Sequence, residues 1–82
     1  MKISYDSPNV LLDWVLRRGR EVLRLQVERT GDRYHVSVSP ANRRRKKPLY
    51  VNVFRLCPNA LQRHATLVAS FREAGWTSVA YR

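Results

Sequence analysis

Apolar and polar residues alternate on both sides of one short turn in Leu23-Arg24-Leu25-Gln26-Val27-Glu28-Arg29-Thr30-Gly31-Asp32-Arg33-Tyr34-His35-Val36-Ser37-Val38-Ser39. Alternation with a period of two is typical of a strand with one buried face. A two-residue turn with glycine first favours a type II′ hairpin. Such a turn fixes the register and sets Val27 opposite Val36, Leu25 opposite Val38, and Glu28 opposite His35. The sequence therefore predicts an antiparallel hairpin over residues 21–39.

Three further elements follow the hairpin. Residues 49–56 alternate again and predict a third strand. Pro58 and Asn59 begin a segment with apolar residues at helical spacing, and Gly75 suits its end, so a helix is predicted over residues 58–75. The alternating segment 76–81 predicts a last strand or an extended tail.

Another helix is predicted before the hairpin, over residues 7–18. Ser7 can cap it and Pro8 suits its first position, while Gly19 is a plausible end. Leu11, Trp14 and further apolar residues would give this helix a wide apolar surface, which is typical of a helix that is well buried or has a partner.

These elements predict an α+β fold of order α-β-β-β-α-β in a single domain, residues 1–82, with an antiparallel sheet and both helices on one face. The strand residues expected to face the helices are Leu23, Leu25, Val27, Tyr34, Val36, Val38, Val51 and Val53. Those expected on the other, open face are Arg24, Gln26, Glu28, His35, Ser37, Tyr50, Asn52 and Phe54.

Charge is the strongest functional signal. The chain of 82 residues carries 16 Lys+Arg against 6 Asp+Glu, which gives a net charge of +10. Five of these cations are consecutive, in a loop expected to be flexible over residues 40–48: Arg43, Arg44, Arg45, Lys46 and Lys47. Adjacent like charges repel and need either solvent or an anionic partner. Because phosphate is a common partner of such a field, we expect a small, non-enzymatic protein that binds nucleic acid, DNA or RNA.

Other residues are candidates for the same interface. Arg17, Arg18 and Arg20 would extend the positive surface, although they could equally complement the helix dipole, and Arg33 and Arg55 could assist. Tyr50 and Phe54, on the open face, could stack on exposed bases. The alternative for this aromatic pair is a face covered by the last strand or by a second copy of the chain.

The sequence also predicts several absences. Cys57 is the only cysteine and cannot form an internal disulfide, so we expect an intracellular, cytoplasmic protein, or one in the nucleoid or nucleus. One cysteine and two histidines give no ligand spacing for a metal, and we expect no cofactor. The first nine residues lack the apolar segment of a signal peptide, and no segment predicts a membrane span.

Catalysis is the least favoured reading. His35 beside Glu28 could act as a general acid or base, but no activating neighbour is recognisable, and a cross-strand polar pair is the simpler interpretation. The order α-β-β-β-α resembles that of the double-stranded-RNA-binding domain and of HicA-type toxin ribonucleases. Neither the basic helix start of the first family nor the Gly-Ser/Thr-His motif of the second is matched here. A HicA-like ribonuclease that uses His35 is kept as a third hypothesis, and no family is assigned.

Two partner hypotheses remain. The chain could act as an adaptor or inhibitor that binds an acidic surface of a protein partner, such as transcription or nuclease machinery. It could also form a homodimer through the apolar surface around Trp14 or through the last segment with Trp76.

Overall fold

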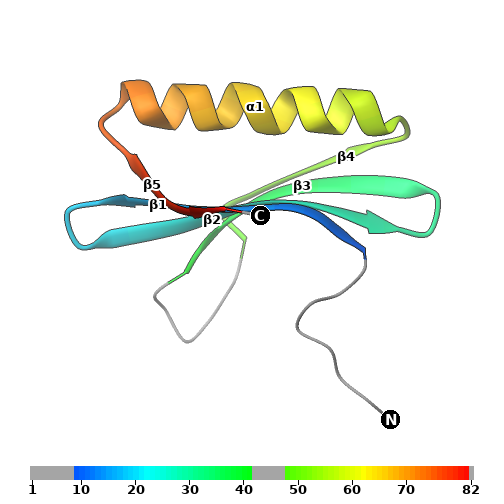
Figure 1. Cartoon of the computed structure of the whole chain (residues 1–82). Helices are drawn as coiled ribbons and strands as arrows, with labels where there is room; N and C mark the ends of the chain where they lie inside the picture. Colours follow the sequence, from blue (N-terminus) through cyan, green and yellow to red (C-terminus); the bar gives the residue numbers. More distant parts are fainter. Residues whose placement is uncertain (1–8, 42–47, 82) are drawn as a thin grey trace, which may run out of the picture.

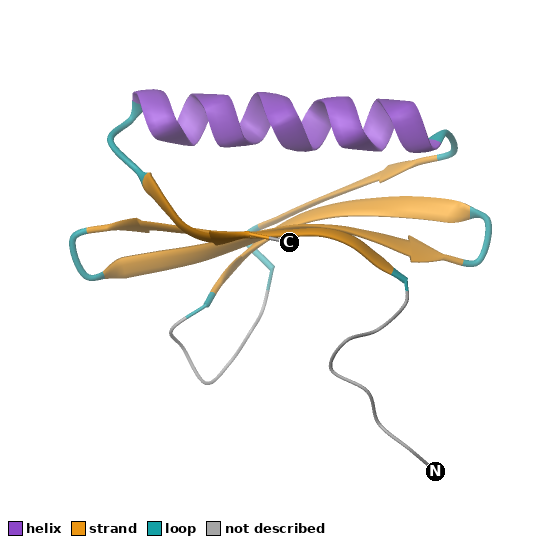
Figure 2. Cartoon of the chain, viewed as in Figure 1, coloured by secondary structure: helices purple, strands orange, loops and turns teal. Residues whose placement is uncertain are grey.

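The computed structural model describes residues 9–41 and 48–81. The described strands form one antiparallel sheet in the order β4-β3-β2-β1-β5, and one helix crosses one face of it (Figures 1 and 2). The elements are β1 (Val10–Arg18), β2 (Glu21–Thr30), β3 (Arg33–Pro40), β4 (Tyr50–Phe54), α1 (Cys57–Glu73) and β5 (Thr77–Tyr81). We call the face opposite α1 the open face.

The predicted hairpin is confirmed as β2 and β3. Val27 pairs with Val36, Leu25 with Val38, and Glu28 with His35, which is the predicted register. Gly31 has φ +63°, and no non-glycine residue in the described ranges has positive φ. Positive φ at the first central residue alone is the combination found in a type II′ turn. The turn thus aligns two apolar rows on one face of the sheet.

The helix predicted over residues 7–18 is wrong for the residues described: the chain forms strand β1 from Val10 onward. A second turn with Gly19 at φ +63° joins β1 to β2. Pairing sets an apolar row of β1 opposite the apolar row of β2: Leu12 with Val27, Trp14 with Leu25, and Leu16 with Leu23. Ladder hydrogen bonds and apolar contacts therefore override a helical spacing that also fits this segment. Ser7 and Pro8, the predicted helix start, lie outside the described residues.

The fold class is corrected accordingly. The described order is β-β-β-β-α-β, mostly sheet, and the described part of the chain has one helix rather than two helices on the sheet. The helix predicted after residue 57 is confirmed as α1, and the last segment forms β5, which pairs with β1. The α-β-β-β-α order, on which the resemblance to RNA-binding and toxin families was based, is absent from the described residues.

The faces of β4 are the reverse of the prediction. Tyr50, Asn52 and Phe54 pair with β3 residues whose side chains face α1, so they face α1 as well, and the Asn52 amide donates to the Tyr50 hydroxyl over 3.0 Å. Val51 and Val53 lie on the open face and are 50% and 49% exposed. Turning the two aromatic rings inward buries more apolar area than turning two valines inward.

The core lies between the sheet and α1. Its buried residues form two clusters, the first of Leu16, Leu23, Leu25, Val38, Val68 and Trp76, and the second of Val27, Val36 and Ala60. Trp76 is 8% exposed, so this ring packs inside the protein and presents little surface to a partner. Trp14 is half-buried and stacks on Tyr81, with 5.0 Å between ring centroids.

His64 is the buried polar residue of the described core, at 2% exposure. Its Nε2 lies 3.0 Å from the Leu25 carbonyl oxygen, which can only accept, so the ring donates from Nε2. Burial lowers the pKa of His64 below its ordinary value of 6.5, and the backbone hydrogen bond and Asp13 oppose that shift only in part. The imidazole is therefore neutral in the folded protein at pH 7.

A lowered pKa links this histidine to acid stability. Below pH 6.5 the unfolded chain takes up a proton that folded His64 resists, so the free energy of unfolding falls as the pH drops below that value. We expect urea unfolding to show this loss between pH 7.5 and 5.5. His64→Gln, which keeps an amide donor but does not titrate, should remove this contribution. An unchanged pH profile in His64→Gln would contradict the assignment.

His64→Ala should lower the free energy of unfolding by about 2–3 kcal/mol at pH 7.5, because it leaves the Leu25 carbonyl without its donor.

Candidate nucleic-acid interface

The described residues that flank the basic run lie at one end of the sheet. Arg43–Lys47 lie outside the described residues, but the chain on both sides is described. The Ala41 amide donates to the Val22 carbonyl over 2.9 Å, and the Leu49 amide donates to the Val38 carbonyl over 2.7 Å. The run therefore leaves and rejoins the sheet where β3 ends and β2 begins, close to the β1–β2 turn.

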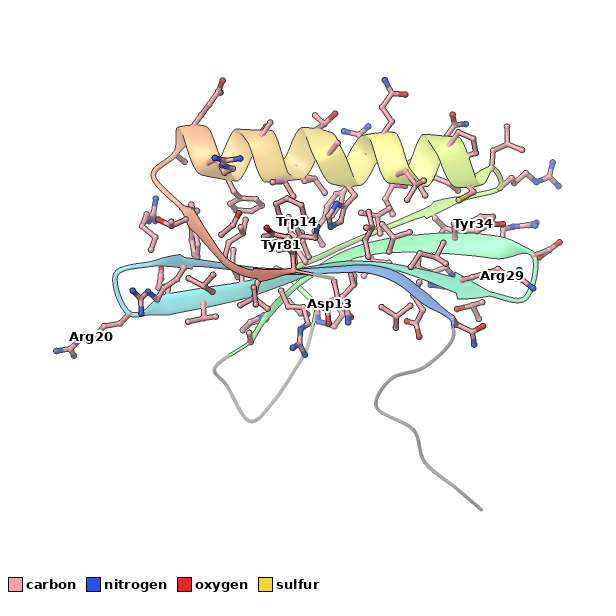
Figure 3. All side chains as sticks on the ribbon, viewed as in Figure 1. Asp13, Trp14, Arg20, Arg29, Tyr34 and Tyr81 are labelled. Carbon is pink, nitrogen blue, oxygen red and sulfur yellow. The ribbon has the colours of Figure 1, made fainter. Side chains whose placement is uncertain are left out.

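Arg17, Arg18 and Arg20 belong to this same end, although they do not end a helix as predicted. They lie on the last part of β1 and in the turn that follows. Arg17 pairs with Val22 and with Thr77, whereas Arg20 extends from the turn away from the sheet (Figure 3). Two hydrogen bonds and one tight turn thus bring the predicted cations of the first segment to the anchors of the basic run. We call this region the basic end.

Arg18 has a structural role within the basic end. Its guanidinium lies 5.0 Å from the centroid of the Trp76 ring. It donates to the Ala74 carbonyl over 3.2 Å and lies 3.6 Å from the Glu21 carboxylate. These contacts hold the β1–β2 turn against the end of α1.

A hollow of about 440 Å³ opens at the basic end. Its walls combine the arginine of the turn, the two flanks of the basic run and one indole ring. The lining residues are Arg20, Glu21, Val22, Leu23, Pro40, Leu49 and Trp76. Arg20 and Glu21 are the charged residues of this lining, one of each sign, and the other five are apolar, so the hollow is mainly apolar.

The remaining predicted cations lie elsewhere. Arg33 follows the β2–β3 turn at the opposite end of the sheet and pairs with Asp32 over 2.9 Å. Arg55 follows β4, just before α1 begins, and is also far along the sheet from the β1–β2 turn. Figure 3 shows the two ends clearly, with Arg20 at one and Arg29 at the other. The predicted set of site residues is therefore divided between two ends.

The predicted stacking surface is wrong. Tyr50 and Phe54 pack against the two core clusters on the α1 side of the sheet. Trp14, Tyr34 and Tyr81 lie on that side too (Figure 3). The described open face carries polar, charged and aliphatic side chains, including the Arg24–Asp13 ion pair at 3.1 Å. Within the described residues, no Phe, Tyr or Trp ring lies on this face to support base stacking.

One charge pattern was missed in reading the sequence. Residues 33–72 contain nine Lys and Arg and no Asp or Glu. This stretch includes β3, β4 and nearly all of α1. A count of acidic residues along the chain would have found it, and it shows that the positive field is concentrated in one part of the molecule.

Neither metal binding nor membrane insertion gains support from the described residues. Glu28 and His35 are opposite one another in the sheet, as predicted. Within residues 9–41 and 48–81, no group of three or more His, Cys, Asp or Glu side chains could hold a metal ion. The described helix is too short or too polar to cross a membrane.

Replacing Arg18 tests the division of roles at the basic end. Arg18→Ala should lower the free energy of unfolding by about 1 kcal/mol, because the contacts with Trp76 and the Ala74 carbonyl are lost from a half-exposed side chain. Arg17→Ala, the adjacent exposed control, should stay within about 0.5 kcal/mol of the wild type. Urea unfolding measures both, and equal losses would contradict a structural role specific to Arg18.

Comparison with known proteins adds no relative: no family model, no curated protein and no solved structure matches this chain.

Proposed function

We propose that this protein binds nucleic acid through contacts with the phosphate backbone. The observation that carries the proposal is the convergence at the basic end. The anchors of the run Arg43–Lys47 lie beside the turn that presents Arg17 and Arg20. Arg17, Arg18 and Arg20 lie at this end of the sheet, and the five cations of the run come between its two described anchors in the sequence. Clustered arginine suits phosphate because its planar fork can bind two oxygens at once.

The distribution of acidic residues supports the same proposal. Asp13, Glu21 and Asp32 each lie within 4 Å of an arginine, Arg24, Arg18 and Arg33 respectively. Residues 33–72 contain no acid, and Glu21, the carboxylate that lines the hollow at the basic end, lies 3.6 Å from Arg18. An external polyanion would neutralise the mutual repulsion among the cations of the basic run and would release its own counterions on binding.

The mode of binding follows from what faces the ligand. Phosphate contacts position a protein on nucleic acid without reading its sequence. Four of the described aromatic rings of the sheet, those of Trp14, Tyr34, Tyr50 and Phe54, pack against the core on the α1 side and are not placed for base recognition. We therefore expect affinity that depends strongly on salt and weakly on base sequence.

Two variants of equal net charge test the proposal. Arg43→Ser/Arg44→Ser/Arg45→Ser removes three cations from the run, and Arg29→Ser/Arg55→Ser/Arg63→Ser removes three cations outside the basic end. Both have a net charge of +7, against +10 for the wild type. Fluorescence anisotropy with labelled single- and double-stranded DNA and RNA, over a salt series, measures affinity and slope. The run variant should lose about 2–3 units of the slope of log K against log salt, and the control about 1 unit or less.

The matched charge makes the outcome decisive. Equal losses in the two variants would mean that total charge, rather than the basic end, drives binding. Wild-type binding no tighter than that of a polylysine control would overturn the proposed function itself. The substrate bound most tightly at about 150 mM salt identifies the preferred nucleic acid.

A further inference from the structure

Strand β4 is an exposed edge with an apolar row. It lies at one end of the strand order and pairs with β3. Its five residues, Tyr50–Phe54, carry no charge. On the open face, Leu49, Val51 and Val53 alternate along this edge and are 68%, 50% and 49% exposed. An edge strand also directs the N–H and C=O groups of alternate residues away from its single neighbour.

The two edges of the sheet differ in how they are protected. At the other edge, the register of β5 with β1 shifts between Val15 and Leu16, which is an irregularity of the bulge type. Bulges, charges and prolines are the devices that stop an edge from accepting another strand. The β4–β3 register runs without a shift from Tyr50 to Phe54, and β4 has none of these devices. Of the two edges, β4 is the one suited to pairing.

Charge defines what could pair there. Arg55 follows β4 directly, and Lys46 and Lys47 come just before it in the sequence. All of β3, β4 and the first sixteen residues of α1 lie in the stretch that has no acidic residue. An uncharged apolar strand that is followed by Arg55 and belongs to an acid-free stretch is complementary to an extended segment with an apolar centre and acidic flanks.

We infer that β4 binds an extended, acidic segment of a partner protein, which adds to the sheet as a further strand. Backbone hydrogen bonds to β4 supply the pairing. Alternate apolar side chains of the partner cover Val51 and Val53, and an acidic flank lies near Arg55. This interaction is separate from phosphate binding at the basic end and does not depend on it.

A second copy of the chain fits this edge less well. Antiparallel pairing of two β4 strands about Asn52 would set Arg55 of one copy opposite Leu49 of the other. The same contact would repeat by symmetry, between chains that each carry +10. Like charges across an interface oppose association, so the edge favours an acidic partner.

The test uses a fluorescein-labelled peptide, Glu-Glu-Val-Thr-Val-Thr-Val-Glu-Glu, with blocked ends, and the full chain. Two further versions carry N-methyl groups on alternate central residues, one on the valines and one on the threonines. Only one set of N–H groups can point at β4, so one version should bind at least about 10-fold more weakly than the other.

The variant Val51→Thr/Val53→Thr should bind the unmodified peptide about 10-fold more weakly, because the apolar row on β4 loses two methyl groups. Val79→Thr, 51% exposed on the opposite edge strand, is the matched control and should bind as the wild type does.

Several outcomes would overturn the inference. Equal affinity for the two methylated versions would mean attraction by charge alone, and no binding at about 1 mM peptide would exclude the site. An equal loss in Val79→Thr would place binding at the other edge or away from both. Sedimentation that shows a dimer, dissociated by Val51→Thr/Val53→Thr, would assign the edge to a second copy.

Discussion

Burial of strand β2 is the constraint on which the rest of the structure depends. Leu25 and Val27 are fully buried, and both β1 and β3 place apolar rows directly opposite them. Each neighbour is joined to β2 by a two-residue turn that begins with a glycine at φ +63°. The turns fix register, register fixes which face each residue occupies, and α1 then covers the one face on which the apolar rows meet. His64 donates to the Leu25 carbonyl and so ties the helix to the centre of this arrangement.

The sequence correctly predicts those elements whose apolar periodicity and end signals indicate the same secondary structure. The β2–β3 hairpin has alternation and a turn signal that agree, and α1 has helical spacing with proline at its start and glycine after its end. Segment 10–18 satisfies two periodicities at once, because it is apolar at most positions. The deciding signal was Gly19-Arg20, which mirrors Gly31-Asp32 and aligns Leu16, Trp14 and Leu12 with Leu23, Leu25 and Val27. The spacing of apolar residues within this segment fits both a helix and a strand, and the pairing that decides between them involves residues outside the segment.

The site was predictable in composition but not in arrangement. The basic run and the arginines near Gly19 are evident in the sequence, and only the strand pairing brings them to one end of the sheet. The error at Tyr50 and Phe54 has a similar cause. Alternation divides β4 into two faces but does not say which one is inward, and both faces contain apolar residues. The choice is made by contact with Tyr34 and Val38 of β3 and with α1, and the alternation within β4 specifies none of these contacts.

The separation of charge along the chain connects the two proposed surfaces. Acidic residues are confined to the first 32 residues and Glu73, so β1 and β2 contain pairs such as Asp13–Arg24 that neutralise one another. In the next 40 residues, all the Asp, Glu, Lys and Arg side chains are Lys or Arg, and this stretch includes both the basic run and strand β4. The two proposed ligands use different residues, but both are anionic and both bind this positively charged stretch of the chain. Neutralisation by either ligand lowers the attraction that remains for the other, and the two associations oppose each other electrostatically.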